Sequence, residues 1–134
     1  MIMRFMLDTN IVSDLVRHPH GCIAKRIAEV GEAGICTSVI VAAELRSAAA
    51  RKASPRLEEQ LESVLRAIEV LSFESPADVV YGALRGRLEE IGQPIGANDL
   101  LVAAHALALR CSLVTDNGRE FARIKALPVE NWLR

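Results

Sequence analysis

Four acidic residues occur where a purely structural role would favour apolar or neutral side chains. Asp8 and Asp116 each follow a short apolar run, in "RFMLD" and in "SLVTD". Asp99 opens the most apolar helical stretch of the chain, and Glu44 lies within "VIVAAELRSAAA". An ionised carboxylate in apolar surroundings is costly unless it is paired or bound to a metal ion. Each of the four is therefore a candidate for a chemical role.

A divalent cation is the partner that would let these carboxylates lie together. If they converge, they repel one another and their titrations become coupled. Mg²⁺, for which Mn²⁺ can substitute, binds carboxylate oxygens and keeps several waters, so such a site can orient a phosphodiester and generate hydroxide. Asp8, Asp99 and Asp116 could be direct ligands, with the longer Glu44 reaching in from its helix. In the simpler alternative, Asp99 only favours a helix N-terminus and the other two aspartates begin ordinary loops.

Short apolar runs alternate along the chain with segments of helical periodicity. The predicted strands are residues 5–7, 34–38, 69–73 and 111–116, with an edge strand within 127–133. The predicted helices are residues 10–18, 21–34, 39–52, 56–68, 77–91, 98–110 and 118–124. This alternation predicts an α/β fold with a central parallel sheet covered on both faces. Ligands of such sheets bind beyond the carboxyl ends of the strands, where Asp8 would lie.

Polar residues and prolines mark the expected helix starts. Asn10 is the predicted N-cap of the first helix, and Ser38 is the predicted N-cap of helix 39–52. Before helix 77–91, Ser75 is the predicted N-cap, Pro76 occupies the first helical position and Asp78 resembles the acid of a capping box.

Composition limits the class of protein. A chain of 134 residues with 51% hydrophobic and 4% aromatic side chains fits one α/β domain with an aliphatic core. No apolar run approaches the roughly 20 residues of a membrane span, so no membrane role is expected. The three cysteines, Cys22, Cys36 and Cys111, share no metal-ligand spacing and are interpreted as reduced, buried thiols of a cytoplasmic protein.

The charge balance does not suggest a nucleic-acid binder at first sight, because the formal net charge is −1. Neutralisation of the four special acids by a metal ion would leave an excess of basic side chains. Five of these lie near the acids in sequence and are candidate phosphate contacts: Arg46, Arg51, Lys52, Arg119 and Arg123. Ordinary solvated helix faces explain the same residues equally well.

The segments "FMLDTNIVSDL", "SVIVAAEL", "GQPIGANDLLVAAHALAL", "LVTDNGREFARI" and "LPVENW" together resemble the PIN-domain family. Within that family the chain is similar to the VapC-type toxin ribonucleases of bacterial toxin–antitoxin systems. The resemblance extends over essentially the whole length and implies a single PIN domain over residues 1–134. It also implies a three-layer α/β/α sandwich, Mg²⁺-dependent endoribonuclease activity, homodimerisation and inhibition by a VapB-type antitoxin.

The resemblance also implies roles for individual residues. Asp8 and Asp99 match the principal metal ligands of the family, Glu44 matches a third acid, and Asp116 occupies a fourth, more variable position. The polar residues that surround the acids in the family correspond to Thr9, Ser38, Thr115 and Asn117 of this chain. Asn10 and Asn98 would shape the loops that hold the acids. The VapC branch that cuts initiator tRNA in the anticodon loop is the most similar, so tRNA is the expected substrate.

Other functions fit the sequence less well. A metal-free ribonuclease needs a general acid–base pair, and the three histidines lie in unfavourable places: two flank Pro19, and His105 is expected in a buried helix. A phosphoaspartyl phosphatase needs a second acid two residues after the first, where this chain has Asn10. The remaining alternative is a catalytically degenerate PIN-like module kept for binding, although such a module should have lost one of the acids.

Overall fold

The predicted parallel sheet is present in the computed structural model, which describes residues 3–134. Five strands pair in the order β3-β2-β1-β4-β5, and every pair is parallel. The strands are β1 (Phe5–Leu7), β2 (Ile35–Ser38), β3 (Glu69–Leu71), β4 (Ser112–Val114) and β5 (Val129–Glu130). The α/β fold with a central parallel sheet is therefore confirmed, including the edge strand near the C-terminus.

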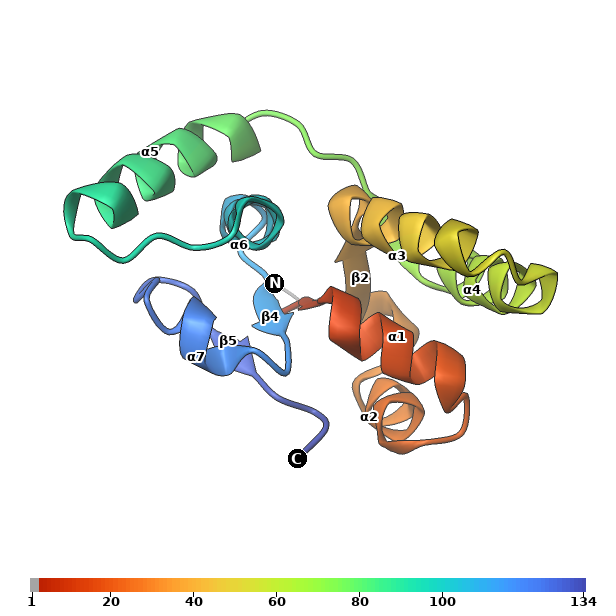
Figure 1. Ribbon diagram of the computed structural model, residues 1–134. Helices are drawn as coiled ribbons and strands as arrows, with labels where there is room; N and C mark the ends of the chain where they lie inside the picture. Colours follow the sequence, from red (N-terminus) through yellow and green to blue (C-terminus); the bar gives the residue numbers. More distant parts are fainter. Residues whose placement is uncertain (1–2) are drawn as a thin grey trace.

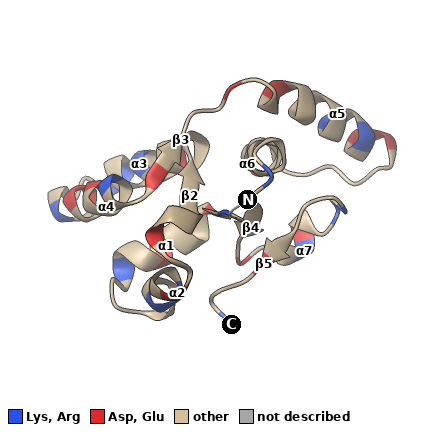
Figure 2. Ribbon diagram, turned by 180° about the vertical axis from the view of Figure 1, so that it is seen from behind, with Lys and Arg blue, Asp and Glu red and all other residues tan. Residues whose placement is uncertain are grey.

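Helices cover both faces of the sheet (Figure 1). They are α1 (Thr9–Arg17), α2 (Cys22–Val30), the short 3-10 helix η1 (Glu32–Gly34), α3 (Val39–Lys52), α4 (Pro55–Ala67), α5 (Ala77–Glu90), α6 (Ala97–Ala108) and α7 (Gly118–Phe121). Helices α1 to α4 lie on one side of the sheet, and α5 to α7 lie on the other (Figure 1). Positions of Lys and Arg (blue) and of Asp and Glu (red) are spread over the ribbons of both helical layers (Figure 2).

The order of the strands creates a topological switch point. The chain runs from β1 through β2 to the edge strand β3, then returns across the sheet to β4 on the opposite side of β1. Connections from β1 and β4 therefore diverge, which leaves a crevice beyond their carboxyl ends. Asp8 directly follows β1, and Thr115 follows β4.

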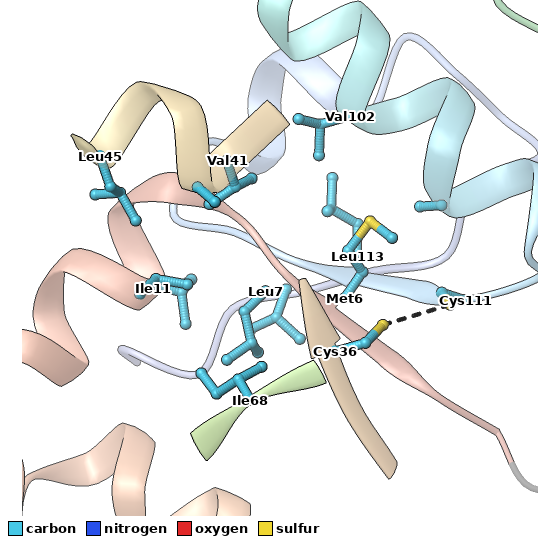
Figure 3. Packing of buried hydrophobic residues seen from close by; sticks show 14 of the residues in the cluster. Met6, Leu7, Ile11, Cys36, Val41, Leu45, Ile68, Val102, Cys111 and Leu113 are labelled. Atoms are coloured by element: carbon cyan, nitrogen blue, oxygen red, sulfur yellow. Dashed lines mark hydrogen bonds between the residues drawn. The ribbon is translucent and has the colours of Figure 1, made fainter. Parts of the chain in front are cut away.

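The core is aliphatic, as the composition predicts. Met6 and Leu7 of β1 are completely buried, and side chains from α1, α3, α6 and β4 pack around them (Figure 3). The Sγ atoms of Cys36 and Cys111 lie 4.0 Å apart within this cluster, and neither residue forms a disulfide. The prediction that all three thiols are buried is wrong for Cys22, which is exposed at the first position of α2.

Two of the predicted N-caps are wrong, although every predicted helix start lies within one residue of the observed one. Helix α1 begins at Thr9, because the extended backbone of Asp8 makes that residue the N-cap in place of Asn10. Helix α5 begins at Ala77 after Pro76, and no side chain caps it, so Ser75 does not have the predicted role. Ser38 is confirmed as the N-cap of α3, since its Oγ accepts a hydrogen bond from the Ile40 backbone N–H.

None of the helices in residues 3–134 combines the length and apolar character that crossing a membrane requires.

Candidate active site

Asp8 occupies the centre of the crevice at the end of β1. Asp8 is only 4% exposed, and its backbone N–H extends the pairing with β4 by donating to the Val114 carbonyl at 2.9 Å. One carboxylate oxygen, Oδ2, accepts a hydrogen bond from the Thr115 hydroxyl at 2.7 Å. Burial raises the pKa of Asp8 and the charges of Glu44 and Glu120 add to this, while the Thr115 hydrogen bond opposes the rise.

Asp99 faces the same crevice from the first turn of α6. Burial, followed by the negative charges of Asp8, Glu120 and Glu44, raises the pKa of Asp99 to about 7. Glu120 also contributes through a side-chain hydrogen bond with Asp99. Carboxylates affect one another this strongly only when they lie close together in a poorly solvated place. Asp8, Glu44 and Asp99 therefore lie within electrostatic reach of one another.

Glu44 reaches the crevice from α3, on the other side of the sheet from Asp99. The Thr9 hydroxyl donates to Glu44 Oε1 at 3.1 Å, so the residue that follows Asp8 orients the third acid. Ser38 Oγ, which caps α3, lies 2.8 Å from His105 Nδ1 of α6. This buried hydrogen bond joins the helix that carries Glu44 to the helix that carries Asp99.

Glu120 is the fourth member of the cluster, and the sequence did not single it out. It lies on α7, where its two carboxylate oxygens accept hydrogen bonds from the Gly96 backbone N–H at 3.0 Å and from Asn117 Nδ2 at 2.7 Å. These contacts fix the side chain beside the start of α6. In the sequence Glu120 is only one charged residue on a short polar helix, and its place four residues after Asp116 was the single available hint.

Asp116 points away from the cluster. Its carboxylate accepts a hydrogen bond from Asn131 Nδ2 at 2.9 Å and lies 3.6 Å from the Arg134 guanidinium. The chain bends at Asp116 after β4 ends, so Thr115 contacts Asp8 while Asp116 contacts the C-terminal segment. The structure thus places Glu120, and not Asp116, beside the other three acids.

The predicted polar residues surround the acids. Besides Thr9, Ser38 and Thr115, the Asn10 side chain accepts from the Asp116 backbone N–H at 3.2 Å and so fixes the loop after β4. The Asn117 backbone N–H donates to the Thr115 hydroxyl at 3.0 Å. Asn98 lies beside Glu44 in a groove of about 430 Å³ between α3 and α6.

The five candidate phosphate contacts lie in different environments. Arg51 borders the groove with Glu44 and Asn98, and Lys52 borders a separate groove between α1, α3 and α4. Arg46 is held by two hydrogen bonds of 2.9 Å to Glu62, which leaves it less available to a phosphate. Arg119 is exposed on α7, and Arg123 donates to the Pro94 carbonyl at 2.6 Å.

The donor chemistry of the cluster fits a hard divalent cation. Within residues 3–134 there is no group of three or more His, Cys, Asp or Glu side chains that could hold a metal ion by themselves. Mg²⁺ does not require such a cage, because it binds through one or two carboxylates and keeps its remaining waters. Asp8 and Asp99, each destabilised as an anion by the other acids, are suited to be those carboxylates.

Comparisons with known proteins identify the family. The PIN domain model matches residues 5–127. Ribonuclease VapC2 of Rickettsia felis is 39% identical over 132 residues, covering 97% of this chain and 98% of the relative. The tRNA(fMet)-specific endonuclease VapC of Shigella flexneri is 30% identical over 132 residues, covering 98% and 99% respectively. The crystal structure of VapBC2 from Rickettsia felis bound to a promoter DNA fragment contains a chain that superposes with a TM-score of 0.88 and 35% identity, covering 97% of this chain and 99% of that one.

The chain belongs to the PIN-domain family and, within it, to the VapC ribonucleases. The architecture and the acid cluster agree with this assignment.

Proposed function

We propose that this chain is the toxin of a type II toxin–antitoxin system and acts as a Mg²⁺-dependent endoribonuclease. The observation that carries the proposal is the set of four carboxylates at the switch point of a parallel sheet. Asp8 is 4% exposed there, and the pKa of Asp99 is raised to about 7 by burial and by the neighbouring acids. Carboxylates held in this way are suited to bind a divalent cation and a phosphodiester together.

In the proposed mechanism Asp8 and Asp99 hold the cation, assisted by Glu120. When bound, the ion would supply a Lewis acid that activates water and neutralises charge on the phosphate. Thr115 keeps Asp8 oriented, while Asn117 and the Gly96 backbone keep Glu120 in place. Hydrolysis by in-line attack of water leaves a 5′-phosphate and a 3′-hydroxyl.

Glu44 is suited to accept the proton of the attacking water. Its Oε1 atom is held by the Thr9 hydroxyl, and within the described part of the chain no hydrogen-bond donor lies on Oε2. Glu44 lines the groove that also contains Asn98 and Arg51. A phosphodiester in this groove would lie between the proposed base and a positive charge.

We propose tRNA as the substrate class and the anticodon loop of initiator tRNA as the specific target. The support is the similarity to the Shigella flexneri relative, whose name states specificity for tRNA(fMet). A VapB-type antitoxin is the proposed inhibitor, because the similar solved structures include VapBC complexes from Rickettsia felis and Salmonella typhimurium. Homodimerisation and a cytoplasmic location complete the proposal.

The test is incubation of the antitoxin-free chain with a total bacterial tRNA pool in Mg²⁺, in Mn²⁺ and in EDTA. We expect discrete fragments with 5′-phosphate ends in either metal, and none in EDTA or with Asp8→Asn. Glu120→Gln and Asp116→Asn form a matched pair, since each removes one acid near the end of β4. Glu120→Gln should lose at least tenfold in rate, whereas Asp116→Asn should retain most activity.

Two outcomes would contradict the proposal. Cleavage that persists in EDTA or with Asp8→Asn would refute the metal mechanism. Absence of cleavage of any RNA by the folded, metal-supplied chain would favour the degenerate PIN-like binding module.

A further inference from the structure

A basic groove lies between α5 and the residues that follow α7. It has a volume of about 510 Å³ and runs between the C-terminal half of α5 and the segment that follows α7. Arg87 of α5 lines one wall, Arg123 and Lys125 line the other, and Gln93 and Ile91 lie at one end. No acidic side chain from the described part of the chain lines it. The two walls line the same groove although about 35 residues separate them in the sequence.

The three cations of this basic groove are not neutralised by the protein. Among residues 3–134, none of Arg87, Arg123 and Lys125 has a carboxylate oxygen within 4.0 Å, in contrast to Arg46 and Arg85. Arg123 is nevertheless fixed in place, because it donates to the Pro94 carbonyl at 2.6 Å. An oriented guanidinium with free N–H groups is suited to contact phosphate oxygens.

The basic groove is connected to the acid cluster through the segment 94–96. Arg123 binds the Pro94 carbonyl on one side of this segment, and Glu120 binds the Gly96 backbone N–H two residues later. Helix α6 begins at Ala97 and carries Asp99 in its first turn. One short segment therefore contacts both a cation of the basic groove and an acid of the cluster.

We propose that the basic groove binds the phosphate backbone of the RNA strand on one side of the scissile phosphodiester. This inference rests on the proposed function, since the occupant is the substrate. A polyanion with regularly spaced phosphates can contact three uncompensated cations and the acid-bound cation at the same time. Ile91, which also lines the groove and is 50% exposed, would accept an unstacked base between the phosphates.

The test measures binding without cleavage. Fluorescence anisotropy of a labelled 20-nucleotide single-stranded RNA in EDTA, at several salt concentrations, compares the unmodified chain with Arg87→Gln/Arg123→Gln/Lys125→Gln. A control triple variant, Lys25→Gln/Arg56→Gln/Arg66→Gln, changes the net charge equally on α2 and α4. Loss of three phosphate contacts should reduce the slope of log affinity against log salt concentration by about 2. Raising salt from 50 to 200 mM should then weaken binding roughly 20-fold less than in the unmodified chain.

The expected result is a loss of RNA affinity with the groove variant only. Arg87→Lys/Arg123→Lys keeps the charges and should bind within about threefold of the unmodified chain. Equal losses in both triple variants would overturn the inference, because they would reflect net charge alone. Unchanged RNA binding, with loss of self-association or of binding to a VapB-type antitoxin, would also overturn it and assign the groove to a protein partner. Failure of the proposed function gives a different result, because cleavage in Mg²⁺ would then be absent. The binding measurement in EDTA tests the basic groove independently of cleavage.

Discussion

Replacing Asp99 with asparagine should abolish most of a pH-dependent loss of stability that the metal-free chain would otherwise show. The pKa of Asp99 is about 7 in the folded chain, compared with an ordinary value of 3.8. Between these values the folded state binds a proton that the unfolded state releases. The free energy of unfolding therefore falls as pH rises from about 4 to about 7, and the stabilising contribution is complete only below the lower value.

The magnitude follows from the size of the shift. About 3 pKa units correspond to about 4 kcal/mol, at about 1.4 kcal/mol for each unit. Asp99 is partly exposed, so solvent screening reduces this contribution to about 2 kcal/mol. An asparagine side chain cannot ionise, so the Asp99→Asn variant lacks this contribution. Between pH 4.5 and pH 8 the free energy of unfolding of the unmodified chain should therefore fall by about 2 kcal/mol more than that of Asp99→Asn.

Urea unfolding in EDTA, followed by circular dichroism at pH 4.5, 6 and 8, measures this difference directly. Asp116→Asn is the control, because it removes an equal charge that faces Asn131 and Arg134 outside the cluster. The control should lose stability with rising pH as the unmodified chain does. Adding Mg²⁺ at pH 8 should stabilise the unmodified chain by roughly 3 kcal/mol at 100 times its dissociation constant, and should stabilise Asp99→Asn less. A pH dependence that is identical in the unmodified chain and in Asp99→Asn would refute the reasoning.

Three further substitutions test the contacts around the site. Thr115→Val keeps the side-chain shape but removes the hydroxyl bonded to Asp8, so the Mg²⁺ concentration for half-maximal cleavage should rise about tenfold; an unchanged value would exclude this role. Ser38→Ala removes the N-cap of α3 and the hydrogen-bond partner of His105 Nδ1, so it should lower the free energy of unfolding by about 2 kcal/mol in urea titrations. The control Ser63→Ala changes an exposed residue and should lower it by less than about 0.5 kcal/mol. Leu113→Ala leaves a cavity in the fully buried core and should cost about 3 kcal/mol in the same assay, a loss below about 1 contradicting the packing.

Most of the fold could be predicted because local patterns and tertiary packing agree along this chain. Short apolar runs become strands, and the helices cover them as the parallel topology requires. Two errors concern which residue caps a helix. Asn10 and Asp8 are both good N-caps by residue type, and only the backbone conformation at the end of β1 decides that Asp8 holds the position. Ser75 illustrates the same limit, since the loop before α5 directs the chain so that no side chain reaches its first turn.

The site could be predicted in part, and the error is instructive. Asp8, Glu44 and Asp99 are conspicuous because apolar residues surround them in the sequence. Glu120 lies on a short polar helix, and nothing in its neighbours distinguishes it from a solvated charge. Its position depends on the docking of α7 against Gly96, a contact across 24 residues. Asp116 presents the opposite case, because it follows an apolar run as Asp8 does, but the bend after β4 directs it to Asn131 and Arg134.

The hydrogen bonds around the acids show how the folded chain accommodates a cluster of carboxylates whose mutual repulsion destabilises it. Thr115 holds Asp8, Thr9 holds Glu44, and Gly96 with Asn117 holds Glu120. Each of these carboxylates thus keeps a neutral donor that orients it without cancelling its charge. An arginine partner would stabilise the same acids more strongly but would compete with a cation for their oxygens. Neutral donors therefore leave the negative charge available to a cation, while burial and the neighbouring acids keep the pKa values of Asp8 and Asp99 raised.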